Sequence, residues 1–563
     1  MMNRRKRPSN NTIFRNIRTK LRQADYSRDV SYLLVFTFLY KYCSDSLKDY
    51  FLSAIEDKEI TLDEAFSDSY YQEMFRDDAF HMFGYYINKP EAYIDEVINA
   101  KYQERFFLSS FFASFAQNIE FVPNSNYEKY FKFLFDAFKR EISLNKLEYD
   151  SEHNLLYKDL IYSIAKLDIY EEKFPFKEVF NQICQFRNIN INHDPDYINL
   201  ILTELVCASK SSPMDVYNPF LNDASSLIKL SEKFPFSYGK SYGKGNDEIT
   251  YCVSIVNMLM NYFDLDNVFL EFGNSIDSVD IGGASFDVIM SKFPHIGGWS
   301  SKSRNKVQNM ELVKRNKRKQ LENMLSKNFK MDENSFANDS QLNDALENLL
   351  EQINDEFNSQ IQFTEEYESL KDSEYLFMIN LINSLKKDGV MAVSISQSFL
   401  FKNSLETLRK YLTYENNFID TIISLPDVLG RYSRPEVICV FKKNKSDDNV
   451  LFIDLSQGFD AKKAHSAFPG AFKRNLLLDE KTIVQLVKTY VNKEIIDRYS
   501  NVVKISDIVR NDFNLSVSRY VDTFEGEFIQ LSDLTHEKEE ITSNIKELNK
   551  KIDKMMDELD IKF

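Results

Sequence analysis

Residues 214–228 read MDVYNPFLNDASSLI, a short apolar run that ends at Asn218-Pro219 and leads into the start of a helix. The same alternation continues downstream, where short apolar runs bounded by Gly, Pro or Asn are separated by segments with helical periodicity. Runs of this kind are typical of strands that are buried on both faces. The predicted strands cover residues 214–217, 236–242, 267–272, 286–291, 389–396, 418–424 and 436–442. This pattern predicts a doubly wound α/β sheet with a ligand crevice at the carboxyl ends of its first strands.

The part of the chain that precedes this sheet reads as helices. Glycine and β-branched clusters are scarce there, and apolar residues follow the spacing of a helix face at Tyr26, Val30, Leu33, Leu34, Phe38 and Cys43. We therefore expect a helical domain over residues 1–195 and a sheet domain over residues 196–300 and 373–500. A charged helical insertion over residues 301–372 and a carboxyl-terminal docking segment over residues 501–563 complete the expected division.

Charge limits the ways in which this chain could bind nucleic acid. The chain has 563 residues, with 70 Lys and Arg against 86 Asp and Glu and a net charge of −16. A chain this acidic is not coated with a polyanion-binding surface, so contact with DNA requires a local basic patch. The insertion holds the best candidate for that patch, although such a run is also typical of a solvated helix face. Its basic residues are Lys302, Arg304, Lys306, Lys314, Arg315, Lys317, Arg318 and Lys319.

Cysteine usage and hydropathy favour a cytoplasmic protein. The five cysteines lie far apart without a Cys-x-x-Cys pair, and the six histidines form no zinc-binding spacing, so we expect reduced thiols and no metal. The longest largely apolar run, residues 30–40, is too short to cross a bilayer. The basic residues Arg4, Arg5, Lys6 and Arg7 are followed by polar residues, which is unlike a secretion signal.

The carboxyl-terminal segment carries a coiled-coil seam. Apolar residues recur there at alternating spacings of four and three, namely Ile541, Ile545, Leu548, Ile552, Met555 and Leu559. One such seam cannot bury itself alone, so it packs on another helix, either in this chain or in a partner. We favour a partner because the seam is terminal and follows a polar stretch.

Several ordered segments together resemble one enzyme family. They are Leu21-Arg22 with residues 32–45, residues 216–228, Tyr242-Gly243-Lys244-Gly245, Gly273-Asn274-Ser275, residues 286–295, residues 389–393, residues 422–426, residues 440–443 and residues 514–520. Their order is similar to that of the methylation subunit of type I restriction-modification systems. The resemblance implies an α/β Rossmann-like methyltransferase domain with an α-helical amino-terminal domain and a carboxyl-terminal helical, coiled-coil tail. It also implies adenine-N6 methylation of double-stranded DNA with S-adenosylmethionine, in assembly with a specificity subunit and a restriction subunit or a second, active methylation subunit.

The cofactor loop departs from the pattern of that family. The family shows Asp-Pro-x-x-Gly-Ser-Gly-Gly, whose glycines allow the backbone to approach the methionine portion of the cofactor closely. Here the loop begins Asn218-Pro219, and the glycine positions hold Asn222, Ala224 and Ser225. Each added Cβ would push into the volume of the ligand. Asp223 would also bring negative charge close to the methionine carboxylate.

Two further cofactor positions have lost their acids. In the family, a Glu after the second strand accepts hydrogen bonds from the ribose hydroxyls. This chain has Gly245 at that position, two residues after Gly243. Asp247 or Glu248 could substitute for the Glu by a shift of register. The acid expected beside the adenine amino group is Asn274, which can still accept one hydrogen bond. A charge-assisted hydrogen bond is worth about 1.5 to 3 kcal/mol. Losing two would weaken cofactor binding by roughly two to four decades.

The target-base motif is the most altered. The family's Asn-Pro-Pro-Tyr or Asn-Pro-Pro-Phe stands here as Lys292-Phe293-Pro294-His295. In the family the Asn side chain accepts from the adenine amino group, whereas an ammonium group only donates. Lys292 would also place positive charge beside a nitrogen that becomes cationic, which opposes the transition state. His295 could stack on an extruded base or be an ordinary surface histidine.

Three functional readings remain open at this point. The first is a catalytically silent methyltransferase-fold subunit, or pseudoenzyme, that clamps DNA and docks a specificity subunit in a phage-defence complex. The second is an active adenine methyltransferase with a variant site. The third is another Rossmann-like enzyme, since Gly243-Lys244-Gly245 resembles the start of the dinucleotide-binding motif Gly-x-Gly-x-x-Gly. The last glycine of that motif is absent here, because Glu248 occupies its position.

Overall fold

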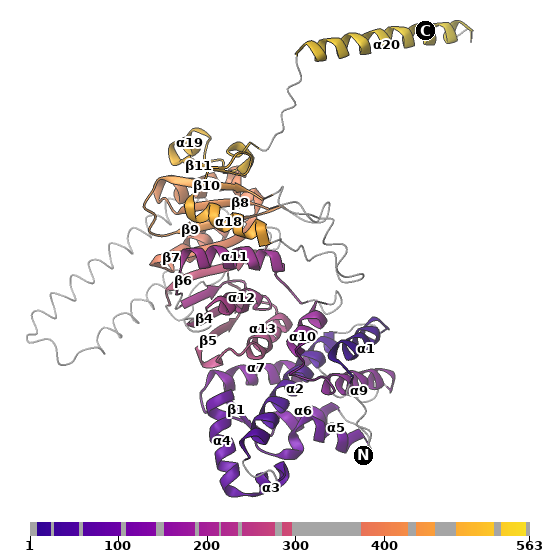
Figure 1. The fold of residues 1–563 in the computed structure, drawn as a ribbon, viewed down its shortest axis with the longest axis vertical. Helices are drawn as coiled ribbons and strands as arrows, with labels where there is room; N and C mark the ends of the chain where they lie inside the picture. Colours follow the sequence, from indigo (N-terminus) through magenta and orange to yellow (C-terminus); the bar gives the residue numbers. More distant parts are fainter. Residues whose placement is uncertain are drawn as a thin grey trace, which may run out of the picture.

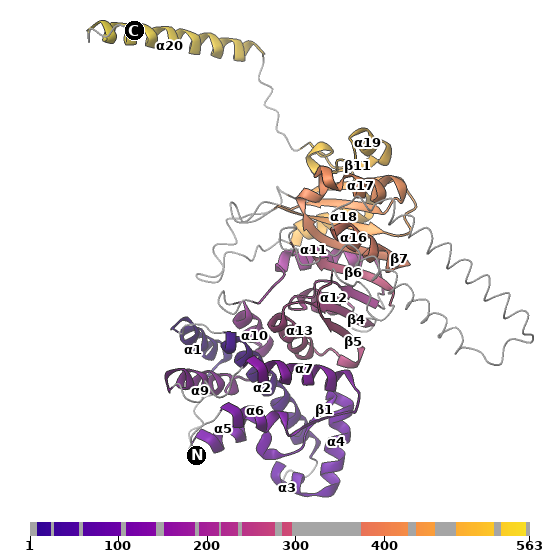
Figure 2. The same ribbon diagram turned by 180° about the vertical axis from the view of Figure 1, so that it is seen from behind.

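The computed structural model describes residues 8–23, 28–55, 60–102, 108–141, 151–185, 191–212, 215–234, 239–275, 284–294, 373–425, 435–455, 480–522 and 531–558. Figure 1 shows two packed parts, a helical domain that carries the amino terminus and a sheet domain beside it. Helix α20 stands apart from both parts (Figures 1 and 2). No helix in the described residues is long and apolar enough to span a membrane.

The helical domain is built around one long helix, α2 (Arg28–Ala54), which is buried along most of its length. The other elements are α1 (Asn10–Gln23), α3 (Leu62–Ser67), α4 (Ser69–Phe83), β1 (Tyr85–Ile87), α5 (Ile94–Tyr102), α6 (Leu108–Ala116), β2 (Ile119–Phe121), α7 (Asn126–Glu141), α9 (Ser151–Ala165) and α10 (Phe176–Cys184). The prediction of helices is confirmed except for β1 and β2, two short strands that pair antiparallel. Each is only three residues long, which is too short for an alternating pattern to be recognised.

Polar side chains of α2 fix neighbouring segments from inside this core. Lys41, almost fully buried, forms an ion pair with Asp45 one turn later, 2.6 Å from Nζ to Oδ2. Ser44 accepts a hydrogen bond from the backbone N–H of Ile94, and Tyr40 donates to the backbone carbonyl of Ala92. The amino-terminal segment that resembles the methylation-subunit family therefore holds α2 against the start of α5.

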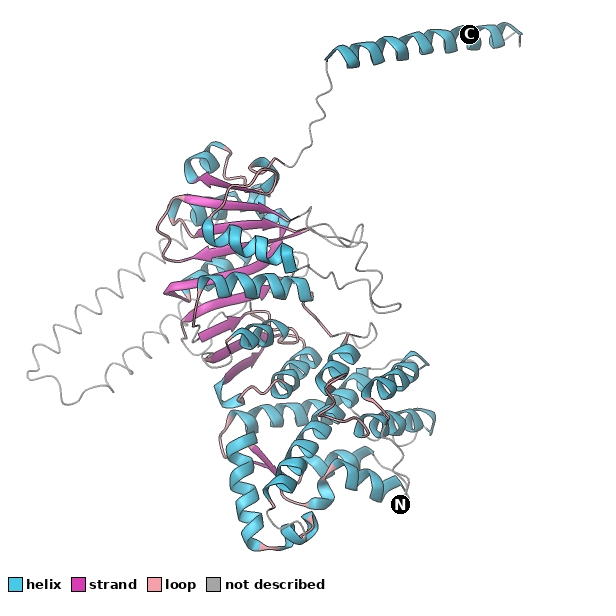
Figure 3. Ribbon diagram, in the orientation of Figure 1, coloured by secondary structure: helices cyan, strands magenta, loops and turns pink. Residues whose placement is uncertain are grey.

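Within the described residues, the sheet domain contains nine strands in the order β11-β10-β8-β9-β7-β6-β3-β4-β5 (Figure 3). Neighbouring strands are parallel except where β9 pairs with β7 and β8 and where β11 pairs with β10. The strands are β3 (Asp215–Asn218), β4 (Lys240–Gly245), β5 (Val268–Phe272), β6 (Phe286–Lys292), β7 (Leu385–Ser396), β8 (Ile419–Ser424), β9 (Glu436–Lys442), β10 (Asn449–Asp454) and β11 (Ser500–Lys504).

Helices cover both faces of this sheet, as Figures 1 and 2 show from opposite sides. Val216 and Val288 point into one hydrophobic cluster, and their neighbours Tyr217 and Ile289 point into another. The helices are α11 (Asp196–Ser209), α12 (Ser225–Lys233), α13 (Glu248–Met260) and α18 (Glu480–Asn492) on one face, with α16 (Ser373–Asn383), α17 (Glu406–Lys410) and α19 (Ile505–Arg510) on the other. The predicted Rossmann-like α/β fold is confirmed.

The structure corrects several strand predictions. β10 and β11 were not predicted, although the run VLFI in β10 is apolar, because a charged turn sets it apart from the preceding strand. β4 begins at Lys240 rather than Phe236, and residues 235–238 lie outside the described part. β7 starts at Leu385, four residues earlier than expected. The insertion over residues 301–372 also lies outside the described residues.

Helix α7 attaches the helical domain to β5, which forms one edge of the sheet. The Tyr130 hydroxyl donates to the carbonyl of Val268 at 2.6 Å and accepts from the N–H of Leu270 at 2.7 Å. Asn126 adds a hydrogen bond from Nδ2 to the same Val268 carbonyl at 3.1 Å. These contacts satisfy backbone groups that an edge strand would otherwise leave unpaired. They also set the position of the helical domain beside the strands of the crevice.

Candidate functional site

The connections between strands switch from one side of β3 to the other within this sheet. From β3 the chain proceeds to β4 and β5 on one side, and it then returns to β6 and β7 on the other side. The crevice of a doubly wound sheet lies outside the carboxyl ends of the strands at such a point. Four of the predicted site residues end or follow these strands, namely Asn218, Gly245, Asn274 and Lys292. Sequence positions far apart in the chain are thus placed along one edge of the sheet.

Asn218, which we expected at the acid position of the cofactor loop, is fully buried and hydrogen-bonded to protein groups. Its Nδ2 donates to the Ser226 hydroxyl at 2.6 Å. Its Oδ1 accepts from the Ser291 hydroxyl at 2.7 Å and from the backbone N–H of Phe220 at 3.0 Å. The amide therefore ties β3 to α12 and β6. These hydrogen bonds engage both ends of the Asn218 amide in contacts within the sheet domain.

The backbone after Asn218 follows a path that glycine would adopt easily. Asn222 and Ala224 have left-handed φ angles of 44° and 63°. Such a conformation costs a residue with a Cβ on the order of 1 kcal/mol. Ala224 is also fully buried. The loop thus keeps the backbone course expected of the glycine-rich family while carrying side chains at the glycine positions.

Asp223, which we expected to bring negative charge close to the methionine carboxylate, contacts protein groups through both of its oxygens. Its Oδ2 lies 2.7 Å from Nδ1 of His193, and its Oδ1 accepts from the Ser225 hydroxyl at 2.6 Å. His193 Nε2 lies 2.9 Å from the carbonyl oxygen of Cys184. Burial lowers the pKa of His193, but the hydrogen bond and charge of Asp223 outweigh burial and raise it overall. The carboxylate therefore has a hydrogen-bonded histidine partner that the sequence analysis did not identify.

Asp194 is the one carboxyl group of this cluster with an unsatisfied oxygen. Its Oδ1 accepts from Asn222 Nδ2 at 2.7 Å, whereas its buried Oδ2 has no hydrogen-bond partner among the described residues. Burial and the nearby charge of Asp223 raise its pKa to about 7, against the opposing effects of Lys292, Asn222 and His193. Its position just before α11 carries no sequence pattern that would have revealed this role.

The ribose position lacks its acid, and the two candidate substitutes are already engaged. Asp247 caps α13 and accepts from the N–H of Thr250 at 3.0 Å. Glu248 accepts from the Tyr32 hydroxyl at 3.0 Å and forms an ion pair with Arg140 of the helical domain. Gly245 itself packs against the Tyr251 side chain.

Other predicted cofactor residues hold the loops together. An added Cβ at Gly243 would lie 2.7 Å from the buried Leu221 side chain, which covers this part of β4. The carbonyl of Pro219 accepts a hydrogen bond from the Ser275 hydroxyl, which joins the loops after β3 and β5. Asn274 lies half-buried beside Ser275.

Lys292 is paired with an acid that the sequence analysis missed. Its Nζ lies 3.0 Å from Oε1 of Glu436, and both side chains are mostly buried, at 18% and 13% exposure. The other oxygen of Glu436 accepts from the Ser394 hydroxyl at 3.0 Å. Because β9 runs antiparallel to β7, its first residue reaches the carboxyl edge of the parallel strands. The sequence predicted strand β9 correctly but did not show that it runs antiparallel to its neighbours. For that reason Glu436 was not assigned to the site.

The remaining predicted site residues fall into three groups. Phe293 is a core residue that packs against Phe220 and Phe377, with Pro294 half-buried after it. His295 and the basic residues of the insertion lie outside the described residues. The seam residues Ile541, Ile545 and Leu548 lie on α20 (Leu531–Glu558) and are 52%, 51% and 57% exposed. Ile552 and Met555 belong to the same helix, and Leu559 lies outside the described part.

We predict that Asp194→Asn stabilises the protein at alkaline pH. The unfolded carboxyl titrates near pH 4, so between about pH 4 and 7 the folded state binds the extra proton. The stability contributed by this group is therefore full below that window and decreases as the pH rises through it. An amide keeps an acceptor for Asn222 without a buried charge.

The free energy of unfolding of Asp194→Asn should exceed that of the wild type by about 3 kcal/mol at pH 8 and match it near pH 4.5. Denaturant unfolding at the two pH values measures this difference. Asp497→Asn, at a carboxylate that is 96% exposed, is the control and should change neither value. A variant that is less stable than the wild type at pH 8 would show that Asp194 is held as a favourable anion.

The comparisons with known proteins agree with this architecture. A family model described as "N-6 DNA Methylase" matches residues 343–527. The methylase subunit of the type I restriction enzyme MpnII from Mycoplasma pneumoniae is 22% identical over 384 residues, which is 66% of this chain and 60% of that protein. The MjaVII methylase subunit from Methanocaldococcus jannaschii is 32% identical over 178 residues, 31% of this chain and 28% of that protein. The chain thus covers less than two thirds of the length of these relatives.

Two solved structures share the fold. A type I restriction-modification methyltransferase subunit from Streptococcus thermophilus has a TM-score of 0.66 at 20% identity, covering 92% of this chain and all of that one. A modification subunit of a type I restriction enzyme from Vibrio vulnificus has a TM-score of 0.52 at 12% identity, covering 88% of this chain and 92% of that one. The resemblance seen in the sequence is therefore confirmed. This chain is similar to the methylase subunits of type I restriction enzymes, and its residues 343–527 match the N-6 DNA methylase family model.

Proposed function

We propose that this chain is a catalytically silent methyltransferase-fold subunit of a type I restriction-modification assembly. The observation that carries the proposal is the Lys292–Glu436 ion pair at the position where the family holds its target-base asparagine. A paired ammonium offers no acceptor to an adenine amino group. Opening the pair to admit a base would leave a mostly buried carboxylate without its counter-charge, which is costly.

S-adenosylmethionine is the cofactor expected of this family, and the residues here do not fit it. The buried amide of Asn218 is already hydrogen-bonded on both ends. Gly245 offers no side chain to ribose, and the acids next to it cap a helix or pair with the helical domain. We therefore derive no methyl-transfer step for this chain.

In the assembly we assign this subunit a role in holding DNA and partner proteins. The helical domain and the sheet domain would clamp double-stranded DNA, with phosphate contacts from the basic residues 302–318. Helix α20 would dock a specificity subunit through its exposed seam. A restriction subunit or an active methylation subunit would complete the complex, as in the systems of its relatives.

An active enzyme with a variant site is the alternative. The observation that favours it is the left-handed backbone at Asn222 and Ala224, because the loop keeps the course that a glycine-rich cofactor loop would take. In that case another acceptor would replace the missing asparagine, and Asp247 or Glu248 would have to leave its present partners to reach ribose.

We predict that neither the wild type nor Lys292→Asn transfers methyl groups to DNA. The substitution restores one family residue while the cofactor loop and the ribose position stay altered. It should also lower the melting temperature, since Glu436 loses its counter-ion, whereas Lys229→Asn at an exposed pair with Glu232 should not. Incorporation of labelled methyl groups into DNA, with an active methylation subunit as positive control, measures the activity. Methylation by either protein would contradict the proposal.

The docking proposal predicts that the seam of α20 is needed for assembly. Replacing Ile541, Ile545 and Leu548 with Ser should abolish copurification of the specificity subunit while leaving the melting temperature unchanged, because these side chains are exposed. A control with Thr542, Lys546 and Asn549 replaced on the same helix should keep the partner. Retention of the specificity subunit by the seam variant would rule out this docking mode.

A further inference from the structure

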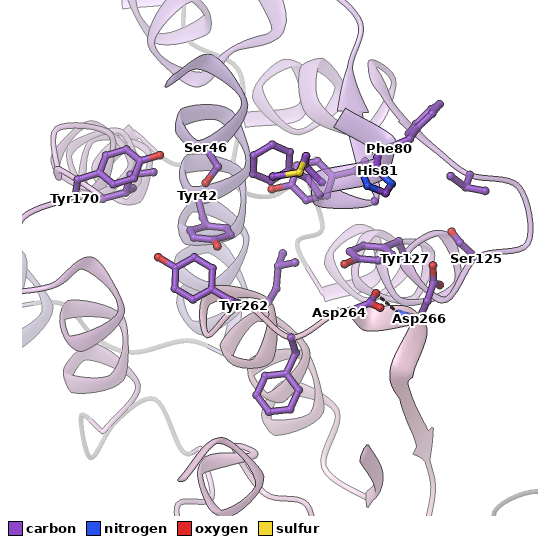
Figure 4. Close-up of a pocket in the computed structure, with 18 residues that line it drawn as sticks. Tyr42, Ser46, Phe80, His81, Ser125, Tyr127, Tyr170, Tyr262, Asp264 and Asp266 are labelled. Atoms are coloured by element: carbon purple, nitrogen blue, oxygen red, sulfur yellow. Dashed lines mark hydrogen bonds between the residues drawn. The ribbon is translucent and has the colours of Figure 1, made fainter. Parts of the chain in front are cut away.

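A cavity of about 640 Å³ lies where the helical domain meets the sheet domain, away from the crevice. We call it the junction cavity. Helix α2 lines it with Tyr42 and Ser46, and the end of α13 and the following turn line it with Tyr262, Asp264 and Asp266. Figure 4 shows these side chains around the space. Its volume falls within the range of small-ligand sites.

The lining of the junction cavity is aromatic and acidic. Lys and Arg are absent from the described residues that line it, its acidic side chains are Asp264 and Asp266, and His81 is a basic side chain in the lining. The aromatic residues are Tyr42, Phe80, Phe83, Tyr85, Tyr127, Tyr170, Tyr262 and Phe263. Aromatic faces and carboxylates together attract cations and repel phosphate. DNA is therefore a poor occupant for this cavity.

Charges just outside the cavity reinforce this preference. Burial, together with the neighbouring Asp49, Tyr262, Asp45 and Asp168, raises the pKa of Tyr170 to about 12. The same surroundings that disfavour a phenolate favour an ammonium or a guanidinium. Lys41, the basic residue closest in sequence to Tyr42, is already paired with Asp45.

Tyr262 is an unusual residue for its position at the mouth of the cavity. It follows the C-cap residue of α13, Asn261, with a left-handed φ of 62°, where glycine or asparagine is favoured, and it is 82% exposed. Tyr170, from a loop of the helical domain, is 57% exposed at the same cavity. Two exposed tyrosines on opposite domains can close over one cationic group.

The chain itself carries a cationic segment within reach. Asn10 donates from Nδ2 to the carbonyl of Asp168 at 2.7 Å and accepts from the N–H of Asp168 at 2.8 Å. Asp168 directly precedes Ile169 and Tyr170, which line the cavity. Residues 4–7, Arg-Arg-Lys-Arg, stand three to six positions before Asn10. An extended chain of six residues spans about 20 Å.

We propose that the junction cavity binds guanidinium and ammonium groups on flexible aliphatic stems, and that the basic residues 4–7 of this chain are its occupant. Their aliphatic stems would lie on the aromatic faces, and their charged groups would lie near the carboxylates. Occupation would connect the amino terminus with both domains at their junction.

The test is a calorimetric titration of the full chain with the acetylated, amidated tetrapeptide Arg-Arg-Lys-Arg. The wild type should bind it weakly because its own segment competes. A variant with Arg4, Arg5, Lys6 and Arg7 changed to Ser should bind it at least tenfold more tightly. A tetrapeptide of four Gln residues should not bind. Equal affinity of the two proteins, or no saturable binding by the variant, would overturn the proposal.

A second pair of variants, made in the background with residues 4–7 neutralised, locates the binding site. Tyr170→Ala with Tyr262→Ala should weaken binding of the basic tetrapeptide by about tenfold. Tyr70→Ala with Tyr414→Ala, at tyrosines that are 69% and 61% exposed and do not line the cavity, is the matched control and should bind like the parent. Equal affinity of the two double variants would place the peptide elsewhere and refute the site.

Discussion

A buried polar group needs a hydrogen-bond partner, and at the carboxyl edge of this sheet the partners come from the protein itself. Asn218 bonds to Ser226 and Ser291, Lys292 pairs with Glu436, and Asp223 faces His193. In an active methyltransferase, the polar atoms at some of these positions would be available to bind the cofactor or the target nucleobase. Here they join β3, β6, α12 and β9, so the groups that would contact ligands contribute to the cohesion of the fold.

Under the proposed function, this exchange explains how the fold can persist after its ligand-binding residues change. The sheet is stabilised by apolar side chains on both faces, which do not depend on the polar edge. Under that proposal, Asn218 in place of an acid or Lys292 in place of an asparagine leaves the packing intact, provided that each group finds a partner. Glu436 and Ser291 supply those partners.

Most strands of the sheet and the amino-terminal helical domain were predictable because apolar runs and helical spacing are local sequence signals. β6 and β9 were placed to within one residue. The site was predictable only in part. The positions of Asn222, Asp223 and Lys292 followed from motif order, but their partners Asp194, His193 and Glu436 come from distant segments that only the topology brings together. β11 was missed because its sequence SNVVK has little apolar content.

Equilibrium binding of S-adenosylmethionine by calorimetry tests the central claim most directly. If the polar groups of the crevice are committed to one another, the full chain should show no saturable heat with S-adenosylmethionine up to about 1 mM, since the loss of two charge-assisted hydrogen bonds costs roughly two to four decades of affinity. Saturable binding with a submicromolar Kd would contradict the account and favour an active methyltransferase.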